Sequence, residues 1–262
     1  MLMTRFTQLV GCGVPIQQAG MGAAAPPELA AAVSEAGAFG MLGTARGGLN
    51  PATLARLLER TRELTSRPFG VNFIMRPGSV AARSPREFIE QAAKASTLVE
   101  FFYTDPSTDF VRIVHDHGAL ASWQVGSRDE ALASADAGCD LIVAQGIAAG
   151  GHIRGTIGLL DLLCEVLEAV PEVPVLAAGG IGTGRAMPWR QAPTACVLGR
   201  ALLPPRRPVS TRYTRTPSSP PARRTVSTPA RSTLAGQKRL TASCVARSMP
   251  PKPSLAASSA RS

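Results

Sequence analysis

The 262-residue sequence predicts an α/β fold, and within that class a (β/α)8 barrel of the TIM type. Three observations favour it. Short apolar runs alternate with amphipathic stretches, which predicts parallel strands joined by helical crossovers. The length suits a barrel, which needs about 200–250 residues. Glycines and polar side chains follow successive apolar runs, where a barrel carries its chemistry.

Seven apolar runs in the first 180 residues have the properties of strands buried on both faces. Each is too short for a helix and is bounded by Gly, Pro or polar residues. The seven are Val14–Ala19, Phe39–Leu42, Phe69–Ile74, Leu98–Tyr103, Ala119–Val125, Leu141–Gln145 and Val175–Ala178.

Helical stretches are expected between these runs. The first begins with Pro27 and Glu28 and is followed by Gly37, a pattern typical of helix ends. The second carries leucines at helical spacing. The predicted helices are Pro27–Ala36, Pro51–Thr65, Pro85–Ala95, Asp109–His117, Ser127–Ala137 and Ile157–Val170.

Seven strands leave two architectures open, a doubly wound open sheet and a barrel that lacks one strand. Chemistry at successive strand ends favours the barrel. We therefore expect an incomplete barrel of about seven strand–helix units, with the eighth strand missing.

Charge divides the chain into two parts. Residues 1–187 hold 14 Lys and Arg and 18 Asp and Glu, a net charge of −4, whereas residues 188–262 hold 14 Lys and Arg and no acidic residue. The second part also holds 12 of the 22 prolines and only 2 of the 25 glycines. We expect a barrel domain over 1–187 and a low-complexity, disordered basic tail over 188–262.

Several protein classes are disfavoured. No apolar run reaches the ~20 residues of a membrane span, and the N-terminus lacks the apolar region of a signal peptide. Five cysteines without metal-type spacing argue against a disulfide scaffold or a zinc module. We expect a reduced, cytoplasmic protein with no metal site.

The densest motif runs from Gln145 to His152, where a strand ends in Gln and a glycine-rich turn delivers one histidine. Gly150 and Gly151 allow close backbone approach to a ligand. His152 is the candidate general base. The alternative is a surface histidine in a flexible loop.

Three further segments are candidate ligand sites. Gly179 and Gly180 follow a strand, and their N–H groups suit a phosphate. The small residues Gly20, Met21 and Gly22 leave room for a flat ring. Asn72 and Gln124 are amides at strand ends that could hold a ring edge, although either could instead be a satisfied loop residue.

Together these blocks resemble the nitronate monooxygenase family, formerly called 2-nitropropane dioxygenases. The resemblance is carried by PIQQAGMG (15–22), GAFGMLG (37–43), FGVNF (69–73), SWQVGS (122–127), AGCDLIVAQG with AGGH (137–152) and PVLAAGGIGTGRAM (174–187).

The resemblance implies an FMN-dependent barrel. It implies that Gly20, Met21, Gly22, Asn72, Gln124, Gln145, Gly150, Gly151, Gly179 and Gly180 hold FMN. It also implies that His152 is catalytic, and that a small nitronate or nitroalkane and O2 are the reactants, giving a carbonyl compound and nitrite. Ala148 departs from the glutamate usual in the family.

Three alternatives remain open. A FabK-type enoyl-acyl carrier protein reductase shares the strand-one turn and the Gly-Gly-His neighbourhood. A non-flavin phosphate-binding barrel would use the same glycine turns. A non-catalytic protein with a nucleic-acid-binding basic tail would use residues 188–262. That segment holds only two aromatic residues, Trp189 and Tyr213, so stacking on bases would be scant.

The acid-free tail also suggests a frameshift. The family continues after GRAM with an eighth strand ending in GTRF, and codons for the segment from Ala186 onward can be chosen that read AMAVAAGADGVRAGTRF in another frame. From the missing strand we expect open sheet edges, weak or absent FMN binding, and aggregation.

Overall fold

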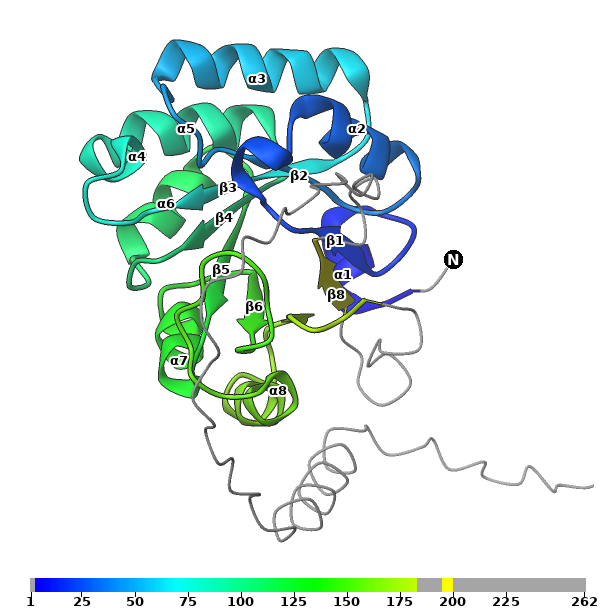
Figure 1. Cartoon of the computed structure of the whole chain (residues 1–262), viewed down its shortest axis with the longest axis vertical. Helices are drawn as coiled ribbons and strands as arrows, with labels where there is room; N and C mark the ends of the chain where they lie inside the picture. Colours follow the sequence, from blue (N-terminus) through cyan, green and yellow to red (C-terminus); the bar gives the residue numbers. More distant parts are fainter. Residues whose placement is uncertain (1–2, 183–194, 200–262) are drawn as a thin grey trace, which may run out of the picture.

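Eight parallel strands form a nearly closed barrel with helices around its outside in the computed structural model (Figure 1). The structure describes residues 3–182 and 195–199. The strands are β1 (Ile16–Gln18), β2 (Gly40–Gly43), β3 (Phe69–Ile74), β4 (Leu98–Phe102), β5 (Leu120–Val125), β6 (Leu141–Gln145), β7 (Val175–Ala178) and β8 (Ala195–Leu198).

Helices connect consecutive strands from β1 to β7, as a parallel sheet requires, and one more helix precedes β1. They are α1 (Arg5–Val10), the 3-10 turn η1 (Gly22–Ala24), α2 (Pro27–Glu35), α3 (Pro51–Leu64), α4 (Val80–Arg83), α5 (Pro85–Ala95), α6 (Thr108–Asp116), α7 (Arg128–Asp136) and α8 (Leu159–Ala169). The barrel class, the seven predicted strands and the six predicted helices are thus confirmed, with ends that differ by one or two residues. Helices α1 and α4 were not predicted.

Helix ends follow from local chemistry. Pro27, Pro51 and Pro85 each occupy the first helical position, where a missing N–H costs nothing. The Asn50 side chain accepts a hydrogen bond from the Thr53 N–H at 2.8 Å and so caps α3.

The prediction that the eighth strand is missing is wrong. Ala195–Leu198 lies between β1 and β7, pairing Cys196 with Ile16 on one side and with Ala177 on the other. Ala195 and Cys196 are each only 2% exposed. A four-residue apolar run suffices to fill this gap, and the Pro- and Arg-rich composition around it concealed the run.

The three consequences drawn from a missing strand, which are open sheet edges, weak or absent FMN binding and aggregation, lose their basis. The barrel continues past residue 187 to include β8, and the two sheet edges that were expected to stay open are paired. The remainder of the expected tail, residues 188–194 and 200–262, lies outside the described residues.

The seam between β1 and β2 is closed by one backbone bridge and one side chain. The backbone supplies one parallel bridge there, between Gln17 and Phe39. One step further along, the fully buried Gln18 side chain donates to the Met41 carbonyl at 2.8 Å and accepts from the Met41 N–H at 3.4 Å. The Gln18 amide therefore replaces a backbone pair in the ladder.

Apolar side chains fill the N-terminal end of the barrel. Phe6 and Val10 of α1 pack there against Phe39, Met41 and other inward-facing strand residues, and the Phe6 and Phe39 rings meet edge to face at 6.0 Å. Helix α1 thus plugs this end of the barrel. A larger cluster lies between the outer strand faces and the helices. Polar groups are left to the opposite end, where the strands finish.

Candidate functional site at the carboxyl ends of the strands

The candidate site residues lie on the turns that follow the strands, at one end of the barrel. Among residues 3–182 and 195–199 no group of three or more His, Cys, Asp or Glu could hold a metal ion. No helix in this described part is long and apolar enough to cross a membrane.

The turn after β1 lies directly against Asn72 of β3. A Cβ placed on Gly20 would be 2.3 Å from the Asn72 Cβ and 2.7 Å from its Oδ1, so only glycine fits. Gly22 has a φ of 55° and would clash through a Cβ with the Ala45 carbonyl oxygen, 2.4 Å away. The β1 turn is therefore pressed onto the ends of its neighbours.

Asn72 is 3% exposed, and its amide group is held by Glu100. Its Nδ2 donates to the Glu100 Oε1 at 2.8 Å, whereas its Oδ1 has no hydrogen-bond partner in the described part of the chain. Glu100, on β4, also accepts from the Gln17 Nε2 at 2.7 Å. Burial raises the pKa of the Glu100 carboxyl, and the two amide donors oppose this rise.

Gln145 and His152 are brought together as the sequence suggested. The Gln145 Nε2 donates to the His152 backbone carbonyl at 2.9 Å, which ties the start of the glycine-rich loop to its end. The Gln145 Oε1 is buried without a partner in the described residues. Gly150 and Gly151 are open, with nothing within 4 Å of an added Cβ. The exposed His152 ring packs edge to face on Tyr103, centroid to centroid 5.6 Å.

The turn after β7 packs on this same loop. Gly179 has a φ of 115°, and an added Cβ would lie 3.0 Å from the Ala149 nitrogen. Gly180 has a φ of 68° and lies beside Ala148. The loops that follow β6 and β7 therefore form one surface, lined by small residues. Gln124, near the end of β5, is half-buried, and no polar contact of its side chain is described.

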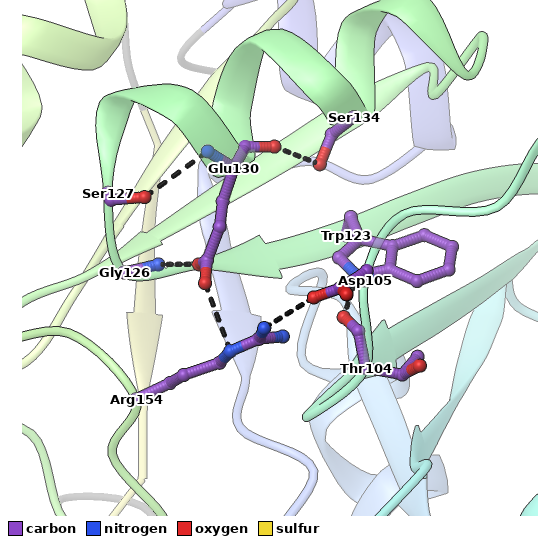
Figure 2. Close-up of polar contacts among 8 residues, drawn as sticks. All are labelled: Thr104, Asp105, Trp123, Gly126, Ser127, Glu130, Ser134 and Arg154. Carbon is purple, nitrogen blue, oxygen red and sulfur yellow. Dashed lines mark hydrogen bonds and ion pairs between the residues drawn. The ribbon is translucent and has the colours of Figure 1, made fainter.

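Arg154 anchors the loop that carries His152. Its Nε contacts the Glu130 Oε1 at 3.0 Å, and its Nη2 pairs with Asp105 in the loop after β4 (Figure 2). Glu130 in turn accepts the Gly126 N–H at 2.7 Å. One guanidinium thus joins the loops that follow β4, β5 and β6.

The same loop also meets the residue that follows β5 by direct backbone contact. A Cβ on Gly155 would lie 2.4 Å from the Gly126 oxygen, so the two chains cross without side chains. The Trp123 indole N–H donates to the Thr104 carbonyl at 3.1 Å and joins β5 to the loop after β4 (Figure 2).

Four residues at this end were missed by the sequence analysis: Gln17, Glu100, Tyr103 and Arg154. Glu100 could have been noticed as one carboxyl within the apolar run LVEFF. Tyr103 has a φ of 72°, an uncommon backbone state for a residue other than glycine, and such states gather at functional sites. Nothing in the local sequence of Arg154 indicates which acidic residues it meets.

Comparisons with known proteins agree with this geometry. The family model described as nitronate monooxygenase matches residues 3–188. A probable nitronate monooxygenase of Staphylococcus aureus is 31% identical over 222 residues, covering 69% of this chain and 61% of its own. A Rhodococcus jostii relative, named as a (3aS,4S,5R,7aS)-5-hydroxy-7a-methyl-1-oxo-octahydro-1H-indene-4-carboxyl-CoA dehydrogenase, is 33% identical over 186 residues. That match covers 71% of this chain and 50% of the relative.

Two solved structures are also similar. FabK from Thermotoga maritima is 34% identical with a TM-score of 0.70, covering 77% of this chain and 63% of FabK. Nitroalkane oxidase from Streptomyces ansochromogenes is 30% identical with a TM-score of 0.65, covering 76% of this chain and 68% of that one.

The chain spans about half the length of the first curated relatives that it matches. The family model nevertheless covers well over half of the chain, on the barrel whose strand ends carry the glycine turns and His152. The chain belongs to the nitronate monooxygenase family of oxidoreductases.

Proposed function

We propose that the chain binds FMN at the carboxyl ends of its strands and oxidises small alkyl nitronates with O2 to a carbonyl compound and nitrite. We call the turns that contain Gly20 and Gly179 the glycine cradle. The proposal rests on this cradle together with buried polar atoms that lack hydrogen-bond partners. Gly20 packs directly on Asn72 and Gly179 on Ala149, so neither turn carries a side chain there, while the Asn72 Oδ1 and Gln145 Oε1 are buried without partners in the described residues. Such atoms are costly unless a ligand satisfies them.

The residues present fit a flavin in both shape and chemistry. A flat ring needs close backbone approach, which the open Gly150 and Gly151 permit, and its polar edge needs hydrogen-bond partners, which Asn72 and Gln145 offer. The residues proposed to hold FMN are Gly20, Met21, Gly22, Asn72, Gln124, Gln145, Gly150, Gly151, Gly179 and Gly180. When bound, FMN supplies the electron acceptance from the nitronate and the reaction with O2.

His152 is proposed to act on the substrate. Its ring is exposed at the barrel end and rests on the edge of Tyr103, and its own carbonyl is held by Gln145. A neutral imidazole there can take the α-proton of a nitroalkane, and an imidazolium can hold the oxygens of a nitronate. Arg154 limits the movement of this loop through Glu130 and Asp105.

The test uses the purified full chain. We expect it to bind FMN and to release nitrite from an alkyl nitronate, and we expect His152→Asn to lower the rate at least about tenfold while FMN stays bound. His117→Asn is the matched control, because that ring bonds the Ile113 carbonyl within α6, away from the strand ends. Unchanged nitrite release by His152→Asn, from a nitroalkane as well as from its nitronate, would remove His152 from the reaction.

A second candidate is a reductase of an enoyl thioester, which the likeness to FabK favours. The same preparation separates the two functions. Oxidation of NADH or NADPH that depends on an enoyl thioester, without nitrite release from nitronates, would favour the reductase. Nitrite release without thioester-dependent oxidation would favour the monooxygenase.

A further inference from the structure

Glu100 is a buried ionisable residue for which the proposed reaction gives no task. It lies on β4 and is 2% exposed, with Asn72 of β3 and Gln17 of β1 bonded to its carboxyl group. In the described part of the chain no Lys or Arg pairs with it. Placing a carboxyl in such surroundings is costly, so a structural filler would be apolar.

The carboxyl group determines the direction of the Asn72 amide. Both Glu100 oxygens accept amide N–H groups, Oε2 from the Gln17 Nε2 at 2.7 Å and Oε1 from the Asn72 Nδ2 at 2.8 Å. A carboxylate only accepts, so the Asn72 NH2 group must face it. The Asn72 Oδ1 is therefore turned away from Glu100.

That oxygen faces the β1 turn. A Cβ on Gly20 would lie 2.3 Å from the Asn72 Cβ and 2.7 Å from its Oδ1, so the glycine lets the turn pack directly on the Asn72 side chain. The oxygen is buried and unpartnered in the described residues. The result is an unpartnered acceptor, fixed in direction, that faces the glycine turn proposed above to hold FMN.

We propose that Glu100 is a positioning residue that holds the Asn72 amide so that its oxygen accepts a hydrogen bond from the imide N–H of the bound ring. This inference rests on the proposed function and adds which edge of the flavin is recognised. The oxidised isoalloxazine ring carries a single N–H, at N3. An asparagine that could turn freely would present its NH2 group half of the time and would not select that edge.

The experiment titrates FMN into the apo form of the full chain, followed by flavin fluorescence. Glu100→Met removes the constraint on Asn72 while keeping the volume, and we expect affinity to fall about tenfold, as the loss of one oriented hydrogen bond implies. Gln17→Met is the matched control, because it removes the other bond to the same carboxyl and leaves Asn72 held; its affinity should stay within about threefold.

Exchanging the amide and the carboxyl group between positions 72 and 100 distinguishes a positioning role from a packing role. Asn72→Asp alone sets two carboxyl groups against each other and should weaken FMN binding. In the double variant Asn72→Asp with Glu100→Gln, the amide introduced on β4 donates to one oxygen of the carboxylate introduced on β3 and accepts from Gln17. The other oxygen of that carboxylate then faces the cradle again. We expect affinity to recover to within about threefold of the unmodified chain.

A ligand analogue tests the chemistry directly. FMN methylated at N3 lacks the N–H, so the unmodified chain should prefer FMN over it, and Glu100→Met should lose most of that preference. A role in folding alone would change thermal stability without changing this ratio.

The outcomes distinguish the two proposals. Failure of the unmodified chain to bind FMN would overturn the proposed function and this assignment with it. FMN binding by the unmodified chain, together with unchanged affinity in Glu100→Met or a double variant no better than Asn72→Asp, would overturn the positioning role alone.

Discussion

Replacing Arg154 tests how firmly the loop of His152 is held. Arg154→Met keeps an unbranched side chain, while both ion pairs are lost. The Glu130 and Arg154 side chains are 22% and 31% exposed and make a 3.0 Å contact, so this pair is partly shielded from water. The Asp105 side chain is 86% exposed, so its pair with Arg154 is screened by solvent.

The expected energies follow from these exposures. A largely exposed pair contributes about 0–0.5 kcal/mol, whereas a partly buried charged hydrogen bond contributes about 1–2 kcal/mol. We therefore expect Arg154→Met to lower the free energy of unfolding by about 1–2 kcal/mol and Asp105→Asn by less than about 0.5 kcal/mol.

The assay is urea unfolding of the apo full chain in a double-mutant cycle. Arg154→Met and Glu130→Gln should show a coupling energy of about 1 kcal/mol, and the cycle with Asp105→Asn a coupling near zero. One molar salt should remove the small Asp105 effect and leave most of the Glu130 coupling. Equal couplings to the two acids, or none to Glu130, would refute the view that Arg154 anchors the loop through α7.

Three further substitutions test the cradle, the seam and the buried carboxyl. Gly20→Ala should abolish most FMN binding in fluorescence titrations, because its Cβ would lie 2.3 Å from the Asn72 Cβ. Gln18→Leu should cost about 2–4 kcal/mol in urea unfolding, because it leaves the Met41 N–H and carbonyl unpaired. The stability of Glu100→Gln relative to the unmodified apo chain should rise with pH. The pKa of Glu100 is raised in the folded state, so ionisation of this carboxyl opposes folding. The unmodified chain therefore loses stability as pH climbs from about 4.5 through the folded-state pKa.

Controls for these substitutions are available in the chain. Gly47→Ala adds a Cβ with nothing within 4 Å and should leave FMN affinity unchanged. Gln8→Leu changes an exposed residue of α1 and should cost less than about 0.5 kcal/mol. A stability difference between Glu100→Gln and the unmodified chain that stays flat from pH 4 to pH 8 would show that the carboxyl does not lose stability on ionising.

Much of the barrel could be predicted because its signals are local. β3, β6 and β7 begin and end at the predicted residues, since apolar runs with glycine or polar ends are legible without tertiary information. β8 was missed for the opposite reason. Its four residues form a strand only because β1 and β7 lie on either side with unpaired edges.

The candidate site was likewise predictable only where its signals are local. The glycine turns and the Gln145–His152 loop are visible as motifs, whereas the tasks of Glu100 and Arg154 depend on partners 24 to 83 residues away. The proposed roles of the individual site residues await the experiments above. The proposed frameshift after Met187 is tested by the gene: an intact reading frame with codons incompatible with the family continuation would exclude it.

A structure of the chain crystallised with FMN tests the central claim most directly. The account predicts the isoalloxazine ring between the Gly20 and Gly179 turns, with the Asn72 Oδ1 within about 3.2 Å of the flavin N3 and His152 facing the ring. A flavin bound elsewhere, or a barrel end that stays closed to FMN at saturating concentration, would contradict it.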